Sequence, residues 1–184
     1  MTLRVFLFSG HMVDAPGRKK PRFPVALEGA VRGAIAGELD RQGASRGDFA
    51  VGSAACGSDL LFAEGLLQRG AALRLCLPLP EPEFLRKSVA FAGDDWVQRF
   101  HAITARAQVD VFPEDSPIAR EASDPYERTN LWMVEEARRL GGQDIVFLCV
   151  WDGEGGDGPG GTAHMVQAVE AAGGSVVRID PGSL

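Results

Sequence analysis

The stretch VGSAACGSDLLFAEGLLQRG, residues Val51–Gly70, decides the fold. It begins as an apolar run, breaks at a series of small residues, and continues with leucines at helical spacing until Gly70. A buried strand that turns directly into an amphipathic helix is half of the repeating unit of a parallel α/β sheet. The turn, Gly-Ser-Ala-Ala-Cys-Gly-Ser, raises the question of what approaches its backbone so closely that only small residues fit.

The same alternation of strand and helix extends outward from this stretch in both directions. Apolar runs predict strands within 3–10, 48–55, 71–80, 108–114, 144–153 and 175–180. Apolar residues at helical spacing predict helices over 25–43, 58–69, 81–107, 125–142 and 162–174, with a break near 92–95.

The segments between these elements contain turn and cap signals. The Pro- and Gly-rich segment 11–24 and the polar segment 115–125 are predicted as loops, and Asp124 before Pro125 predicts a helix N-cap. Strict alternation implies right-handed crossovers and a sheet covered on both faces. The sequence therefore predicts one α/β domain over residues 1–184, a Rossmann-like three-layer sandwich with a mainly parallel central sheet.

Length and composition indicate a single globular domain. The chain has 184 residues, of which 45% are hydrophobic and 24% are charged. The net charge of −6 disfavours a nucleic-acid surface, because phosphate binding needs concentrated Lys and Arg. The first apolar run is too short for a signal sequence or a membrane span, so we expect a cytoplasmic protein without a membrane partner.

The cysteines and histidines do not suggest a metal site. Cys56, Cys76 and Cys149 show no CxxC spacing and the three histidines are scattered, so no metal and no cofactor are predicted. Cys76 and Cys149 lie in apolar runs, where a free thiol behaves as a small hydrophobe. An odd number of mostly buried thiols fits a reducing cytoplasm.

Ligands of a parallel sheet of this kind bind beyond the carboxyl ends of its strands. Small or polar residues follow predicted strand ends at 9–11, 52–59 and 151–162. The last two of these loops are rich in small residues and lead directly into helices, whose N-terminal N–H groups can hold a phosphate. GxGxxG, GxxxxGK[ST] and GxSxG motifs do not occur. The pattern predicts a nucleotide or sugar-phosphate ligand and disfavours a dinucleotide oxidoreductase or a P-loop NTPase.

Four short stretches occur in the order FSGH at 8–11, GSAACGSD at 52–59, YERTN at 126–130 and GPGGT at 158–162. Together they resemble the SLOG superfamily of Rossmannoid nucleotide-binding domains, which includes DNA-processing protein A and the Lonely Guy phosphoribohydrolases. The turn in the DNA-processing branch reads Ser-Gly-x-Ala-x-Gly-x-Asp; Ala55, Gly57 and Asp59 match, while Gly52 and Ser53 stand in swapped order. GPGGT at 158–162 resembles the second phosphate-binding turn of the superfamily. FSGH at 8–11 and YERTN at 126–130 resemble a less studied branch.

One departure from the superfamily concerns catalysis. The phosphoribohydrolases follow their Gly-Thr pair with two residues and then a catalytic Glu, a position that Met165 occupies here. A methionine cannot accept a proton. The resemblance therefore supports ligand binding more than hydrolysis, and an enzyme would need to use Glu64 or Asp59 instead.

Candidate site residues lie at the strand ends and at the starts of the helices. The candidate ligand-binding residues are Ser9, Gly10, His11, Gly52, Ser53, Ala54, Gly57, Ser58, Asp59, Arg86, Arg128, Asn130, Asp152, Gly160, Gly161 and Thr162. The hydroxyl groups of Ser53, Ser58 and Thr162 suit either a phosphate oxygen or a helix cap. The glycines suit either a phosphate or a tight turn.

Other candidates keep two interpretations as well. Asp59 either braces its loop at a helix N-terminus or binds a ribose. Arg86 and Arg128 are candidates for pairing with phosphate, and Asn130 for bracing a neighbouring loop. Trp151 either stacks on a base or belongs to the core.

The function predicted from these residues is a sensor domain that binds a nucleotide or a nucleotide-derived small molecule between two glycine-rich turns. Its signal would pass to a second copy of the chain or to an effector domain or protein. A nucleotide N-glycosidase of the phosphoribohydrolase type and a DNA-binding module of the DNA-processing type are the alternatives. Gly57→Asp or Gly160→Asp is expected to abolish binding without unfolding the protein.

Overall fold

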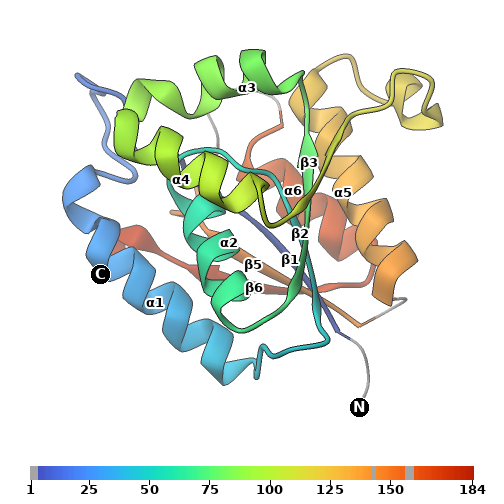
Figure 1. Ribbon diagram of the computed structural model, residues 1–184, viewed down its shortest axis with the longest axis horizontal. Helices are drawn as coiled ribbons and strands as arrows, with labels where there is room; N and C mark the ends of the chain where they lie inside the picture. Colours follow the sequence, from blue (N-terminus) through green and yellow to red (C-terminus); the bar gives the residue numbers. More distant parts are fainter. Residues whose placement is uncertain (1–3, 142–143, 156–159) are drawn as a thin grey trace.

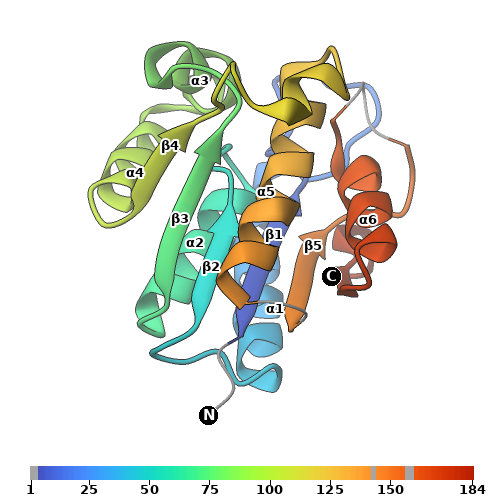
Figure 2. The same ribbon diagram turned by 90° about the vertical axis from the view of Figure 1, so that its right-hand side faces the viewer.

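A computed structural model describes residues 4–141, 144–155 and 160–184. Over these residues the chain forms a parallel sheet of six strands in the order β4-β3-β2-β1-β5-β6 (Figures 1 and 2). The strands are β1 Val5–Gly10, β2 Phe49–Gly52, β3 Ala72–Leu77, β4 Gln108–Val111, β5 Ile145–Val150 and β6 Ser175–Ile179. The predicted Rossmann-like three-layer sandwich is confirmed.

Helices cover both faces of the sheet. They are α1 Glu28–Arg41, α2 Ser58–Gln68, α3 Glu81–Ser88, α4 Asp94–Thr104, α5 Pro125–Gly141 and α6 Thr162–Ala171. Short 3-10 turns lie at η1 Val25–Leu27, η2 Ala90–Ala92, η3 Pro117–Arg120 and η4 Pro181–Ser183. Figures 1 and 2 show α1, α2 and α4 on one face of the sheet and α5 and α6 on the other.

The strand order reverses between β1 and β5. From β1 the chain adds β2, β3 and β4 on one side, and then returns to place β5 against the other side of β1. The two strands pair in register from Val5↔Ile145 to Gly10↔Val150. Such a switch point leaves a crevice at the carboxyl ends of the strands, where ligands of open α/β sheets bind.

The ends of the helices follow the local signals in the sequence. The Asp124 carboxylate caps α5 by accepting hydrogen bonds from the N–H groups of Tyr126 (2.8 Å) and Glu127 (3.1 Å), as predicted. The segment 81–107 splits into α3, η2 and α4 at Gly93, within the predicted break. The segment 115–125 is not simply a polar loop, since its turn η3 buries Ile118.

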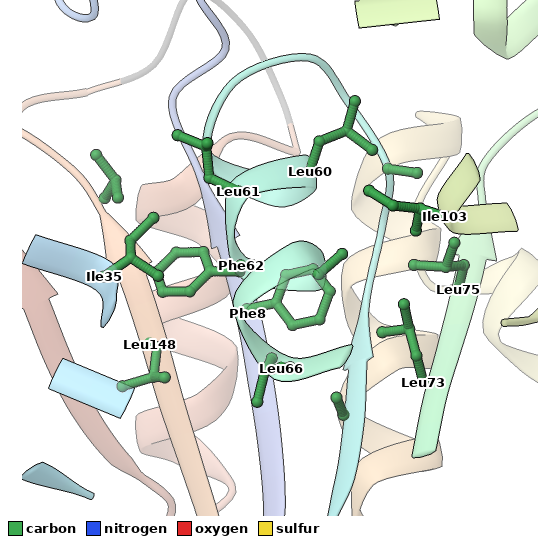
Figure 3. Packing of buried hydrophobic residues seen from close by; sticks show 14 of the residues in the cluster. Phe8, Ile35, Leu60, Leu61, Phe62, Leu66, Leu73, Leu75, Ile103 and Leu148 are labelled. Atoms are coloured by element: carbon green, nitrogen blue, oxygen red, sulfur yellow. The ribbon is translucent and has the colours of Figure 1, made fainter. Parts of the chain in front are cut away.

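Two apolar clusters hold the layers together, one on each face of the sheet. Figure 3 shows the cluster under α1, α2 and α4, in which the rings of Phe8 and Phe62 lie 5.9 Å apart. The three cysteines are free and buried, and for Cys76 and Cys149 this agrees with their predicted role as small hydrophobes. No helix within the described residues has the length and apolar character needed to cross a membrane.

Candidate functional site

A cavity of about 340 Å³ lies at the carboxyl ends of the strands. Its wall comes from the residues that follow β1, β2, β3 and β5 and from the first turns of α2, α5 and α6. This volume is within the range of small-molecule sites. The cavity therefore occupies the place where the topology of the sheet predicts a ligand.

The structure brings together more than half of the residues predicted for this site. The cavity is lined by Ser9, Gly10, His11, Ser53, Asp59, Asn130, Gly160, Gly161 and Thr162. Over the described residues, the lining does not include Gly52, Ala54, Gly57, Ser58, Glu64, Arg86, Arg128 or Asp152. The first two residues of the GPGGT motif, 158 and 159, lie outside the described residues.

The β2–α2 turn is small because another part of the same chain lies against it. Gly57 has a φ of +97°, and a Cβ atom there would lie 2.6 Å from the backbone nitrogen of Val13. Ser58 donates to the carbonyl oxygen of His11 through both its N–H (3.1 Å) and its hydroxyl group (2.7 Å). The loop after β1 therefore occupies the N–H and hydroxyl donors of Ser58, which a phosphate at this turn could otherwise use.

Close contacts within the chain also explain why residues 10 and 52 are glycines. A Cβ atom on Gly52 would lie 2.2 Å from the ring of Phe8, and one on Gly10 would lie 2.6 Å from the Cβ atom of Ser58. Such distances do not occur between packed atoms. These glycines are needed for the fit between neighbouring strand ends, whatever the cavity holds.

The turn that leads into α6 is held from one side by α5. Gly160 has a φ of +75°, and a Cβ atom there would lie 2.5 Å from the Cβ atom of Tyr126. The Asn130 side chain donates to the carbonyl oxygen of Gly160 (2.8 Å), so Asn130 braces a neighbouring loop, one of its predicted roles. On the other side, Gly161 and Thr162 line the cavity.

The helices α2, α5 and α6 all begin beside the cavity, but their first N–H groups are used differently. Asp124 caps α5, and the carbonyl oxygen of His11 accepts from the first N–H of α2, which belongs to Ser58. The N-cap of α6 is Gly161, and within the described residues no side chain caps this helix. An anionic group in the cavity can therefore be stabilised by the start of α6.

The loop 11–24 forms one wall of the cavity and is fixed by the partly buried carboxylate of Asp14. Asp14 accepts from the N–H groups of Arg22 (3.0 Å) and Phe23 (3.1 Å) and lies 3.3 Å from the guanidinium group of Arg18. Phe23 and Val13 are buried in the core and anchor the loop. Arg18 and Arg22 line the cavity and place two guanidinium groups on its wall, where Arg22 also lies 3.8 Å from the carboxylate of Asp152.

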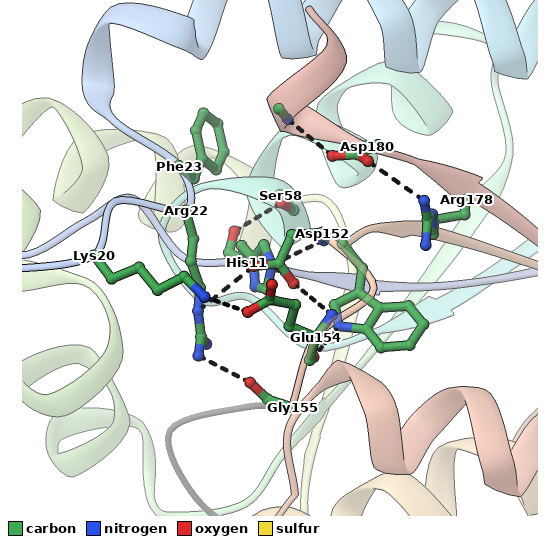
Figure 4. A network of polar contacts seen from close by, with 12 residues as sticks. His11, Lys20, Arg22, Phe23, Ser58, Asp152, Glu154, Gly155, Arg178 and Asp180 are labelled. Carbon is green, nitrogen blue, oxygen red and sulfur yellow. Dashed lines mark hydrogen bonds and ion pairs between the residues drawn. The ribbon is translucent and has the colours of Figure 1, made fainter.

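Polar contacts join this loop to the residues after β5, as Figure 4 shows. The side chain of Arg22 donates to the carbonyl oxygen of Gly155 (2.9 Å), and Lys20 forms an ion pair with Glu154. The N–H of Asp152 donates to Nε2 of His11 (3.2 Å). Asp152 is not among the cavity-lining residues, but it contacts His11, which is.

Burial lowers the pKa of His11, and this effect outweighs the attraction of the Asp152 carboxylate. The imidazole is therefore neutral at pH 7, which suits an Nε2 atom that accepts a hydrogen bond from a backbone N–H. Burial also opposes ionisation of Asp152, but the hydrogen bond from the N–H of Glu154 and the positive charge of Arg22 act in the opposite direction, and the pKa of its carboxyl group is lowered.

Asp59 is the most unusual group of the cavity. Its side chain is 6% exposed, and burial raises the pKa of its carboxyl group to about 7 against the opposing effect of the Ala55 and Gly10 N–H groups. Oδ2 accepts a hydrogen bond from Ala55 N–H at 3.3 Å. Among the residues that the structure describes, Oδ1 of Asp59 and Oγ of Ser53 are buried without a partner.

Several predicted residues serve other purposes. Glu64 forms ion pairs with Arg32 and Arg99, each at 2.6 Å, away from the cavity. Arg86 is exposed on α3. The guanidinium group of Arg128 lies over the ring of Phe112, 5.2 Å from its centroid. These three positions argue against roles in holding or cleaving a ligand in this cavity.

The loop after β1 contributes more residues to the cavity than the sequence predicted. Arg18 was not among the candidates, although the basic segment GRKKPR at 17–22 follows the carboxyl end of the first strand. The aromatic wall of the cavity was missed as well; Phe84, Phe91 and Tyr126 belong to it. Trp151 also lines the cavity, and its indole N–H donates to the carbonyl oxygen of Glu154 (2.7 Å).

Within the described residues, no group of three or more His, Cys, Asp or Glu side chains is arranged to hold a metal ion. Neither the protein-family models nor the curated proteins compared with this chain include a match to it.

Proposed function

We propose that this chain is a sensor domain that binds a nucleotide or a nucleotide-derived small molecule in the cavity beside β1 and β5. The observation that carries the proposal is the composition of this cavity. It combines a helix N-terminus that no described side chain caps, two arginines and an aromatic wall at the switch point of a parallel sheet. The resemblance of the turns to the SLOG superfamily supports the same function.

The phosphate group is assigned to the start of α6. Gly161 and Thr162 begin this helix at the cavity, and Arg18 and Arg22 line the same space from the loop after β1. Charge-assisted hydrogen bonds from arginine and from helix N–H groups are the usual partners of phosphate. The β2–α2 turn is not part of this assignment, because the His11 carbonyl oxygen occupies its Ser58 donors.

The base is assigned to the apolar wall. Phe84, Phe91 and Met133 line the cavity together with Tyr126. Flat apolar and aromatic surfaces favour the stacking of a heterocycle, whereas a bare phosphate gains nothing from them. A ligand with an anionic and an aromatic part therefore suits this cavity better than a simple anion.

Binding without cleavage is favoured by the position of the carboxylates. Met165 is fully buried in the core cluster between the sheet and α5 and α6, so the position that carries the catalytic Glu in the phosphoribohydrolases is unsuited to acid–base chemistry here. Asp59 lines the cavity, and the N-glycosidase alternative therefore rests on Asp59 alone. Release of free base from AMP or NAD that is lost in Asp59→Asn would support that alternative against the sensor.

The test of the proposed site is calorimetry with AMP, ADP-ribose, NAD and cyclic dinucleotides on the wild type and two arginine variants. Arg18→Ala removes a cation from the cavity wall and should weaken binding about tenfold. Arg86→Ala removes an exposed arginine outside the lining and should leave affinity unchanged.

Equal weakening in both arginine variants would indicate a general charge effect and no phosphate site in the cavity. If none of these compounds binds to the wild type, the proposed function fails. A gel shift with single-stranded DNA at low salt tests the DNA-binding alternative, which the net charge of −6 disfavours.

A further inference from the structure

We infer that Asp59 and Ser53 together bind a sugar hydroxyl group of the ligand. This inference rests on the proposed function and assigns the second polar end of the same cavity. Both residues line the cavity, and both belong to the segment that joins β2 to α2.

A polar atom of each of these two side chains is buried and lacks a partner among the described residues. Across the described part of the chain, the buried side-chain atoms without a hydrogen-bond partner are Oδ1 of Asp59, Oγ of Ser53 and Nε of Arg128. Arg128 lies over Phe112, outside the cavity lining. The other two atoms belong to residues that are six positions apart on one turn, and both residues line the same cavity. Buried polar groups are normally paired, so two unpaired groups on one turn indicate a missing partner.

A hydroxyl group has the chemistry that the missing partner needs. Because burial raises the pKa of Asp59 to about 7, its carboxyl group is present in both protonation states near neutral pH. A hydroxyl group of a ligand can donate to the ionised carboxylate and accept from the protonated carboxyl group. It can also donate to the serine hydroxyl group or accept from it. An amino group cannot accept from the protonated form, and a phosphate is repelled by the ionised form.

The other side-chain acceptors discussed for this cavity, those of Asp14 and His11, already accept hydrogen bonds from backbone N–H groups. Asp14 accepts from the backbone of its own loop, at the N–H groups of Arg22 and Phe23. Nε2 of His11 accepts from the N–H of Asp152. Asp59 thus has the cavity-lining carboxylate oxygen that lacks a partner among the described residues.

The distance between the start of α6 and Asp59 suits a phosphorylated sugar. The strand β1 lies between β2, which leads to Asp59, and β5, which leads to α6. Strands in a sheet are about 4.8 Å apart, so the ends of β2 and β5 are separated by roughly 10 Å. One phosphate group cannot reach both ends, whereas a phosphate joined to a sugar extends from one towards the other.

The experiment measures binding of AMP, GMP and UMP and of their 2′-deoxy and 3′-deoxy counterparts by calorimetry. The wild type should bind at least one ribonucleotide about tenfold more tightly than one of its deoxy counterparts. Ser53→Ala and Asp59→Asn should reduce that preference to twofold or less. Ser53→Ala removes an atom without a partner, so it should fold normally, and thermal unfolding checks both variants.

The matched control is Asp48→Asn. Asp48 is a buried aspartate just before the other end of β2, where its carboxylate accepts from the N–H and hydroxyl groups of Ser45. This variant should keep the wild-type preference, because Asp48 lies outside the cavity lining of the described residues.

The outcomes separate this inference from the proposed function. Equal binding of ribonucleotides and deoxynucleotides by the wild type overturns the hydroxyl assignment and leaves nucleotide binding intact. A preference that persists in both cavity variants also overturns it. If inosine monophosphate binds much more weakly than AMP while the deoxy compounds bind normally, the partner is a base amino group and the assignment is wrong. If no nucleotide binds, the proposed function fails and this inference fails with it.

Discussion

The turns before α2 and α6 have similar sequences and different surroundings. Both are rich in glycine, and both follow a strand of the parallel sheet. At the first turn, the loop after β1 accepts both donors of Ser58 and leaves no room for a side chain at Gly57. At the second, α5 approaches Gly160 from one side, while Gly161 opens onto the cavity without a capping side chain within the described residues. A glycine-rich turn therefore marks a close approach of backbone, and the sequence does not say whether the approaching group is protein or ligand.

The largest effect expected from this comparison is on stability. Gly57→Ala places a Cβ atom 2.6 Å from Val13 N at a φ of +97°, and should destabilise the protein by about 3 kcal/mol or more. Gly173→Ala is the matched control, because its φ is +79° and nothing lies within 4 Å, so it should cost about 1 kcal/mol. Urea unfolding measures both. Similar values for the two variants would mean that the loop after β1 does not pack tightly on the turn.

The same geometry corrects an expectation from the sequence. Gly57→Asp and Gly160→Asp were expected to remove binding and leave the fold intact. Both positions have positive φ, and a Cβ atom at either would lie within 2.6 Å of a neighbouring atom, so these variants disturb the fold first. Variants of Arg18 and Ser53 test the cavity more cleanly.

The second effect is a pH dependence of stability that originates at Asp59. Its pKa rises from 3.8 to about 7 on folding, so the folded protein keeps a proton that the unfolded chain releases between these values. Stability from this group is complete below pH 4 and is lost as the pH rises to 7, by up to about 1.4 kcal/mol per pH unit. From pH 5 to pH 8 the wild type should lose about 2–3 kcal/mol more than Asp59→Asn. Parallel pH profiles of the two proteins would show that Asp59 is not buried in this way.

The smallest effect separates two serines of one turn. Ser58→Ala removes a buried hydroxyl group that donates to His11 O at 2.7 Å, and should cost about 1–2 kcal/mol. Ser53→Ala removes a hydroxyl group without a partner among the described residues, and should change stability by less than about 0.5 kcal/mol. Chemical denaturation of both variants measures the difference. A larger loss for Ser53→Ala would reveal a partner for its hydroxyl group in the protein.

Most of the fold was predictable, because its signals are local. The apolar run at 145–150 and the cap at Asp124 each depend on a few neighbouring residues, and the structure confirms both. The alternation of such elements then leaves few topologies, since parallel crossovers are right-handed. The segment 115–125 was the exception, because burial of Ile118 in η3 depends on packing against distant residues.

The site was only partly predictable, because it depends on contacts between segments far apart in the chain. Nothing in the sequence around Gly57 reveals that residues 11–13 pack against it. The direction of a side chain on a helix also decides whether it reaches the cavity. Asn130 and Arg128 are two positions apart on α5, and residues at that spacing do not share a face. One faces the cavity and the other lies over Phe112.

The contacts that hold the loop 11–24 differ in their sensitivity to salt. Its root is anchored by the buried side chains of Val13 and Phe23, whereas its tip is joined to the β5 side by Lys20 and Glu154, which are 70% and 60% exposed. Exposed ion pairs are weak and are screened by dissolved salt, while apolar anchors are not. The ionic strength of the medium therefore acts on the tip of the loop and leaves its root in place. Added salt therefore weakens one exposed contact between this wall of the cavity and the β5 side, while the hydrogen bond from Arg22 to Gly155 and the apolar anchors remain.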